Sequence, residues 1–156
     1  MPDTDTRPRL VLDTNTVMAL WFFEDPALAQ LRAAIDARRV ALVARADALE
    51  ELRRVLAYRQ FGIASERQAG LLADYAARCV SIAPAAPEAE ALPACRDRDD
   101  QKFLEIARDG GASHLVSRDK ALLRLNRHRL VRARFAIVTP EAFCLALDGE
   151  AGRTRD

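Results

Sequence analysis

The chain has 156 residues, a formal net charge of +1 at pH 7 and a hydrophobic fraction of 50%. This length predicts a single domain with a sizeable core, and the near-neutral charge excludes an overall field that would attract nucleic acid. Three scattered cysteines without a CxxC pair argue against a disulfide framework or a structural zinc site. No apolar run reaches membrane-spanning length and the N-terminus is polar, so we expect a cytoplasmic protein without a membrane partner.

The first half of the chain predicts alternating strands and helices. Residues 1–8 combine two prolines with alternating charges and are expected to form a flexible leader. The apolar run Leu10–Leu12 predicts a buried strand that ends at Asp13, after which Thr14 or Asn15 can cap a helix. Further strands are expected at 40–43 and 79–82, and helices at 17–22, 26–35, 47–56 and 65–77. Of the aromatic residues Trp21, Phe22 and Phe23, at least two are expected in the core.

The second half repeats the alternation after a proline-rich loop at 84–93, which is too short to separate two domains. Asp99 or Asp100 opens a helix that Gly110–Gly111 ends. The remaining expected elements are strands at 113–117 and 135–138, helices at 119–125 and 139–147, and a polar tail at 148–156. Alternating strands and helices predict an α/β single-domain three-layer sandwich over residues 9–147, with about five parallel strands flanked by helices.

Four acidic residues occupy positions at which one pocket can collect them. Asp13 and Asp119 follow strands and Asp100 starts a helix, so all three belong to the same edge of a parallel sheet. Glu51 lies just past the first turn of its helix and can reach inward. Crowded carboxylates repel one another unless a cation neutralises them, and oxygen ligands without His or Cys favour Mg²⁺ or Mn²⁺. This set of acids therefore predicts metal-assisted phosphoryl chemistry.

Each acid also has a purely structural interpretation. Asp13 and Asp119 can simply cap helices, and the group Asp97, Asp99 and Asp100 can stabilise a helix N-terminus. Glu51 can be a solvated helix residue among Glu50, Arg53 and Arg54. The metal interpretation is favoured because all four acids occur together.

Four motifs in the same order resemble those of the PIN-domain ribonucleases, and within them the branch of bacterial toxin–antitoxin toxin components. The motifs are Leu12-Asp13-Thr14-Asn15, Glu51-Leu52, the acidic helix opening Cys95–Leu104, and Ser117-Arg118-Asp119. The closing segment Val138–Phe143 is similar to the last strand-to-helix junction of that branch. The resemblance covers about residues 9–147, nearly the whole chain.

The resemblance implies an endoribonuclease that hydrolyses RNA phosphodiester bonds with Mg²⁺ or Mn²⁺. Carried over position by position, it makes Asp13, Glu51, Asp100 and Asp119 the metal-binding acids. Supporting positions are Asn15, Ser117 and Asp99, and candidates for RNA contact are Arg53, Arg54, Arg118 and the basic run 124–134. The implied partners are an antitoxin protein and a second copy of the chain.

Three features depart from the family pattern. Asp47 stands near the helix start where relatives carry Ser or Thr as the cap, so Asp47 is expected to take over that role. Glu50 beside Glu51 leaves the second ligand open, as do Asp97 and Asp99 for the third.

Two other functions are alternatives to the nuclease. A haloacid-dehalogenase-type phosphatase also begins with an acid at a strand end, but needs a second acid where Asn15 stands. A non-catalytic PIN-like regulatory module would keep the acids only to hold a structural metal or to dock a protein partner. The presence of all four acids favours the nuclease.

Overall fold

The structure, a computed structural model, describes residues 6–153, with side chains described as far as residue 149. Residues 1–5 of the expected leader and 154–156 of the expected tail lie outside this range. Five parallel strands form one sheet in the order β3-β2-β1-β4-β5. They are β1 (Arg9–Leu12), β2 (Ala41–Arg45), β3 (Cys79–Ile82), β4 (His114–Val116) and β5 (Ala136–Val138). The predicted α/β class and parallel sheet are confirmed.

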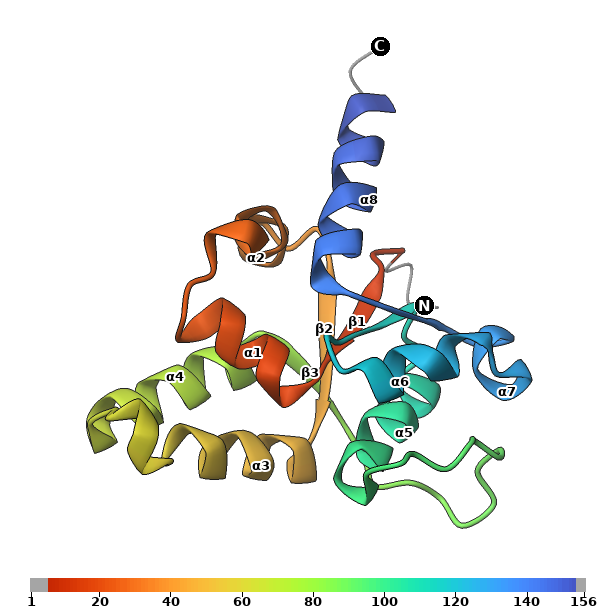
Figure 1. Cartoon of the computed structure of the whole chain (residues 1–156), viewed down its shortest axis with the longest axis horizontal. Coiled ribbons are helices and arrows are strands. Elements are labelled where there is room, and N and C mark those ends of the chain that lie inside the picture. The colour runs from red at the N-terminus through yellow and green to blue at the C-terminus, as the bar shows by residue number, and fades with distance from the viewer. Residues whose placement is uncertain (1–5, 154–156) are drawn as a thin grey trace, which may run out of the picture.

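Helices cover both faces of the sheet (Figure 1). One face carries α1 (Thr14–Trp21), α2 (Ala29–Asp36), α3 (Ala46–Leu56), α4 (Ser65–Ala77) and the start of α8 (Pro140–Arg153). The other face carries α5 (Gln101–Asp109), α6 (Lys120–Arg124) and α7 (Arg129–Arg132). Short 3₁₀ turns connect these elements at Pro26–Leu28, Arg59–Phe61, Arg98–Asp100 and Leu125–Arg127.

The sheet separates two hydrophobic cores. Successive strand residues point to opposite faces, so Leu10 and Leu12 pack with α1 to α4 while Val11 packs against α5. The central strands are buried from Leu10 to Leu12 in β1 and throughout β2, which explains why residues 10–12 and 41–44 are continuous apolar runs. Trp21 is buried and Phe22 packs against the core, as expected for two of the three aromatic residues, whereas Phe23 is exposed.

The topology fixes where a site can form. From the central strand β1, the chain first builds β2 and β3 on one side and later β4 and β5 on the other. Chain connections therefore diverge next to β1, and the crevice beyond the carboxyl ends of β1 and β4 is the position at which open α/β sheets bind ligands. Asp13 and Ser117 follow these two strands directly.

The structure corrects several element boundaries. Asp13 itself caps α1, so neither Thr14 nor Asn15 has that role. Strand β2 continues to Arg45, because this side chain is neutralised by two carboxylates and can therefore be buried. Residues 148–153 are helical in α8 rather than a separate polar tail, and α7 lies within the basic run. No helix in the described range is long and apolar enough to cross a membrane.

Candidate active site

Asp13 is held in a fixed position at the end of β1. Its Oδ1 accepts hydrogen bonds from the backbone N–H of Thr16 at 3.0 Å and from the Thr16 hydroxyl at 2.6 Å. Its Oδ2 accepts a hydrogen bond from the hydroxyl of Ser117. Asp13 is only 6% exposed, and this burial raises the pKa of its carboxyl although the hydrogen bonds oppose the shift. The residue is thus both the N-cap of α1 and a buried acid at the sheet edge.

Ser117 connects Asp13 with Asp119. The serine is completely buried at the end of β4, where its Oγ donates to Asp13 and accepts a hydrogen bond from the backbone N–H of Asp119 at 2.9 Å. Asp119 in turn caps α6, since its Oδ1 accepts a hydrogen bond from the N–H of Leu122 at 3.0 Å. One buried hydroxyl therefore sets the separation of two acids that follow neighbouring strands.

Glu51 reaches the same region from α3. Its Oε2 accepts a hydrogen bond from the Thr14 hydroxyl, and its Oε1 lies 2.9 Å from the Nζ of Lys102 on α5. Glu50 instead forms an ion pair with Arg53 on the exposed side of α3. Of the two neighbouring glutamates, only Glu51 lines the acidic cavity described below.

Asp100 stands at the junction between the 3₁₀ turn Arg98–Asp100 and α5. Partial burial and the negative charges of Asp119, Asp97, Asp13 and Glu51 raise the pKa of Asp100 to about 6. The 3₁₀ turn before α5 is capped by Asp97, whose Oδ1 accepts a hydrogen bond from the N–H of Asp99 at 2.9 Å. The carboxylate of Asp100 therefore caps no helix and lies among other negative charges.

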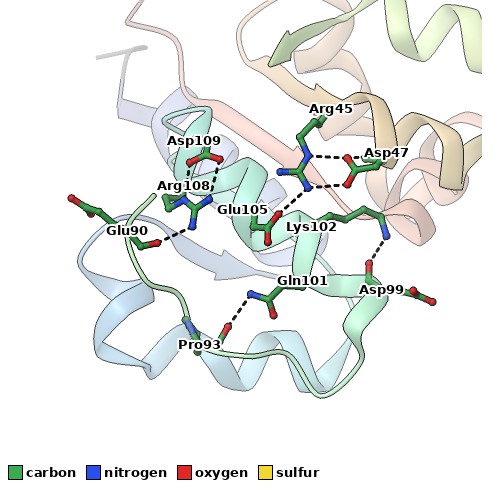
Figure 2. Close-up of polar contacts among 11 residues, drawn as sticks. Arg45, Asp47, Glu90, Pro93, Asp99, Gln101, Lys102, Glu105, Arg108 and Asp109 are labelled. Atoms are coloured by element: carbon green, nitrogen blue, oxygen red, sulfur yellow. Dashed lines mark hydrogen bonds and ion pairs between the residues drawn. The ribbon is translucent and has the colours of Figure 1, made fainter. Parts of the chain in front are cut away.

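Ion pairs and hydrogen bonds join α5 to β2, to α3 and to the loop that precedes it (Figure 2). The guanidinium of Arg45 contacts Asp47 and Glu105 at 2.8 and 2.9 Å, which joins the end of β2 to α3 and α5. Asp47 is thus a partner of Arg45, while the N-cap position of α3 is occupied by Arg45 and not, as expected, by Asp47. Gln101 also ties the preceding loop to α5, since its Nε2 donates to the carbonyl of Pro93 at 3.1 Å.

The acids border two adjoining cavities. The first, with a volume of about 300 Å³, is the acidic cavity, whose polar lining includes Asp13, Asn15, Glu51, Asp97, Asp99, Asp100 and Asp119 beside aromatic residues. The second, of about 790 Å³, shares Asp97, Asp100 and Asp119 with the first. We call it the basic cavity, because four cations line it: Arg96, Arg98, Lys120 and Arg124. An acidic centre beside a row of cations suits a polyanion with a cation bound at its reacting group.

The sequence profile of the PIN domain family matches residues 9–121, most of the chain, including all four acids. The chain belongs to the PIN domain family. No curated protein and no solved structure gives a significant match to it. PIN domains are generally nucleases, which supports a hydrolase, and PIN nucleases usually use divalent metals.

The donor set of this PIN domain fits such a metal by chemistry. The four acids offer only oxygen ligands, the class that Mg²⁺ and Mn²⁺ prefer, and partial burial together with neighbouring carboxylates raises the pKa of Asp100. Within the described part of the chain, no three His, Cys, Asp or Glu side chains are close enough together to bind one ion as they stand, so the four acids would have to move closer together to share a cation. In this structure Glu51 forms an ion pair with the ammonium group of Lys102.

Three arginines predicted to contact RNA lie outside both cavities of the PIN domain. Arg118 is held by Asp25 and Glu141, and Arg53 is paired with Glu50. Arg54 is exposed on α3. Of the predicted basic run, Arg124 lines the basic cavity.

Sequence reasoning missed the roles of Thr14 and Lys102. Lys102 comes three residues after Asp99, so the sequence could have indicated that the two residues lie close together. The Nζ of Lys102 does donate a hydrogen bond to the Asp99 carbonyl. Its ion pair with Glu51 joins residues that are 51 positions apart, and no local pattern signals such a contact.

Proposed function

We propose that this PIN domain is a Mg²⁺- or Mn²⁺-dependent endoribonuclease that hydrolyses phosphodiester bonds of RNA. The observation that carries the proposal is that Asp13, Glu51, Asp100 and Asp119, from four separate elements, line one cavity. The raised pKa of Asp100 supports it, because this acid is partly buried among the carboxylates of Asp119, Asp97, Asp13 and Glu51, an environment that a bound cation would relieve. Membership of a family of nucleases supports the same reaction class.

The residues of the chain have separable tasks in this reaction. Asp13, Glu51, Asp100 and Asp119 would hold the cation, which supplies charge neutralisation at the phosphate and activation of the attacking water. Ser117 and Thr16 orient Asp13 through hydrogen bonds to both of its oxygens. Thr14 and Lys102 orient Glu51 in the same way. Such fixed positions matter because displacement of a reacting group by about 1 Å costs on the order of a hundredfold in rate.

The basic cavity gives the RNA backbone a place to bind next to the acids. Arg96 and Arg98 precede α5, while Lys120 and Arg124 lie on α6, so cations flank Asp100 and Asp119 from two elements. Contacts of this type carry the sequence-independent part of nucleic-acid affinity and weaken as salt increases. We therefore assign RNA backbone binding to these four residues, of which Arg124 belongs to the basic run named from sequence.

The test is cleavage of a mixed-sequence RNA by purified protein in Mg²⁺, in Mn²⁺ and in EDTA. The Asp13→Asn variant is expected to lose cleavage by at least a hundredfold, since the loss of one charge weakens the cation site, while the amide oxygen still caps α1. Equal cleavage by the variant and the wild type would contradict the assignment of the acids.

Two neighbouring glutamates provide a matched control. Glu51→Gln is expected to reduce cleavage strongly, whereas Glu50→Gln, which removes an equal charge one residue away, is expected to leave cleavage unchanged. If neither the wild type nor the variants cleave RNA while the chain binds a protein partner tightly, the alternative of a non-catalytic PIN-like module holds.

We further propose that the nuclease is the toxin of a toxin–antitoxin pair, acts in the cytoplasm and forms a homodimer. The resemblance to the toxin branch supports the toxin role and the homodimer. The three free thiols suit the reducing environment of the cytoplasm. Induced expression should arrest growth for the wild type but not for Asp13→Asn, and co-expression of the adjacent gene should relieve the arrest. Sedimentation equilibrium should give twice the chain mass.

A further inference from the structure

Four aromatic rings gather on the surface where α1 ends and α3 is followed by a 3₁₀ turn. We call Phe22, Phe23, Tyr58 and Phe61 the aromatic cluster. Phe61 is its centre, with ring centroids 5.7 Å from Phe22, 5.8 Å from Phe23 and 6.2 Å from Tyr58. Gly62 ends the turn with a φ of 58°, a left-handed conformation that lets the chain reverse directly after Phe61.

The cluster has a buried side and an exposed side. Phe22 and Phe61 pack against the hydrophobic core and so account for the stability of this corner. Tyr58 is 48% exposed, and its ring stacks on that of Phe61 at an interplanar angle of 12°. Core packing therefore explains Phe22 and Phe61 but leaves the exposed ring of Tyr58 without a structural purpose.

Tyr58 and Phe61 also line the acidic cavity together with Asp13, Glu51 and Asp100. The aromatic rings of Tyr58 and Phe61 thus border the same cavity as the acids, and the basic cavity shares Asp100 and Asp119 with it. A single strand of nucleic acid carries a group that suits each of these surfaces. Its planar uncharged base suits the aromatic rings, one phosphate with a bound cation suits the acids, and further phosphates suit the basic cavity.

We propose that Tyr58, backed by Phe61, is a stacking site for one unpaired base next to the phosphate at the acids. This inference rests on the proposed nuclease function and adds to it a contact that only an unpaired base can make. In a duplex the base faces are covered by their neighbours, so only an unpaired base can stack on the ring. The stacking site is sequence-tolerant because every base has a π face.

The experiment measures the affinity of the Asp13→Asn protein, which does not degrade its ligand, for a fluorescein-labelled single-stranded RNA in Mg²⁺. Adding Tyr58→Ala should weaken binding about five- to a hundredfold, the range for loss of one stacked base. Tyr58→Phe keeps the ring and should retain affinity within about twofold. A 2-aminopurine base placed in the RNA should lose its quenching in Tyr58→Ala but keep it in Tyr58→Phe.

Phe23→Ala is the matched control, because Phe23 is 58% exposed and contacts the same Phe61 but does not line the acidic cavity. This variant should bind the RNA like its parent, and Tyr58→Ala should not change the weaker binding of a blunt RNA duplex. Unchanged affinity in Tyr58→Ala, or equal losses in Phe23→Ala, would overturn the stacking site. So would a change in sedimentation in Tyr58→Ala alone, which would assign the ring to a protein interface.

The two proposals fail in different ways. If the wild type cleaves RNA and Tyr58→Ala binds it normally, the stacking site is wrong and the nuclease stands. If the wild type neither cleaves nor binds RNA, the nuclease proposal fails and the stacking site fails with it.

Discussion

At the scale of single residues, the acids of the site differ in burial and in hydrogen bonding. Asp13 is buried and fully hydrogen-bonded, whereas Asp100 is half-buried among other carboxylates. The positions of these acids were predictable from sequence, because each follows a strand or starts a helix. The contacts that orient them were not, since Ser117 to Asp13 and Lys102 to Glu51 span 104 and 51 residues.

Asp100 makes the stability of the metal-free protein depend on pH. Its pKa is raised from 3.8 to about 6, so folding favours the protonated carboxyl. This contribution is fully present below about pH 4 and is lost as the pH rises through 6. Asp100→Asn, which stays neutral, should therefore have a Tm about 1–3 °C above the wild type at pH 7 in EDTA, after discounting for solvent screening.

At pH 4 the two proteins should unfold at nearly the same temperature, because both then carry an uncharged group at position 100. Thermal melts by circular dichroism at the two pH values measure the difference. A constant Tm difference across this range would show that Asp100 is not repelled by its neighbours.

At the scale of elements, α5 carries Lys102 and begins directly after Asp100, so its packing on the sheet determines the shape of the cavity. Gly110 follows the last residue of the helix, and a Cβ added there would lie 2.5 Å from Cγ1 of Val43 on β2 and 2.9 Å from the carbonyl of Ile106. Because the obstacle is a buried strand residue and backbone, it cannot move away cheaply.

Gly110→Ala is therefore expected to destabilise the fold by about 1–3 kcal/mol through overpacking. Gly70→Ala on the exposed face of α4 serves as the control, since a Cβ there meets no atom within 4 Å. That substitution should stabilise the protein by about 0.5–1 kcal/mol because alanine favours a helix. Urea denaturation of both variants measures the contrast, and equal effects would contradict the close packing of α5 on β2.

Element prediction succeeded where apolar periodicity was strong and failed where tertiary contacts decided. The sequence indicates β1 and β4 because their apolar runs are continuous and end at polar residues. It does not indicate that β2 includes Arg45, because the neutralising Glu105 comes 60 residues later. The short α7 was missed because two of its four residues are basic and it is too short to show an apolar stripe.

At the scale of the whole molecule, the acids come from segments that only the finished fold brings together. Asp13 and Asp119 follow adjacent strands, yet the chain between them forms most of the sheet. A cation bound by all four acids therefore binds the folded chain and not the unfolded chain, which links metal binding to stability.

Addition of Mg²⁺ or Mn²⁺ should raise the Tm in proportion to the logarithm of its concentration above the dissociation constant. At a hundred times that constant the stabilisation should be about 2.7 kcal/mol, and Asp13→Asn should lose most of it. Differential scanning fluorimetry with Ca²⁺ and Na⁺ at matched ionic strength separates site binding from general screening. An identical response of wild type and Asp13→Asn would place the metal elsewhere.

The double role of Asp13 and Asp119 as acids and helix caps limits how the gene can lose its activity. Asparagine at either position arises by one nucleotide change and keeps an oxygen for the cap, whereas alanine sacrifices about 1 kcal/mol of helix stability. Glu51 and Asp100 cap no helix and are under no such restraint. Inactive descendants of this chain should therefore retain asparagine at 13 and 119 while positions 51 and 100 diverge freely, a pattern that would distinguish decayed copies from working ones.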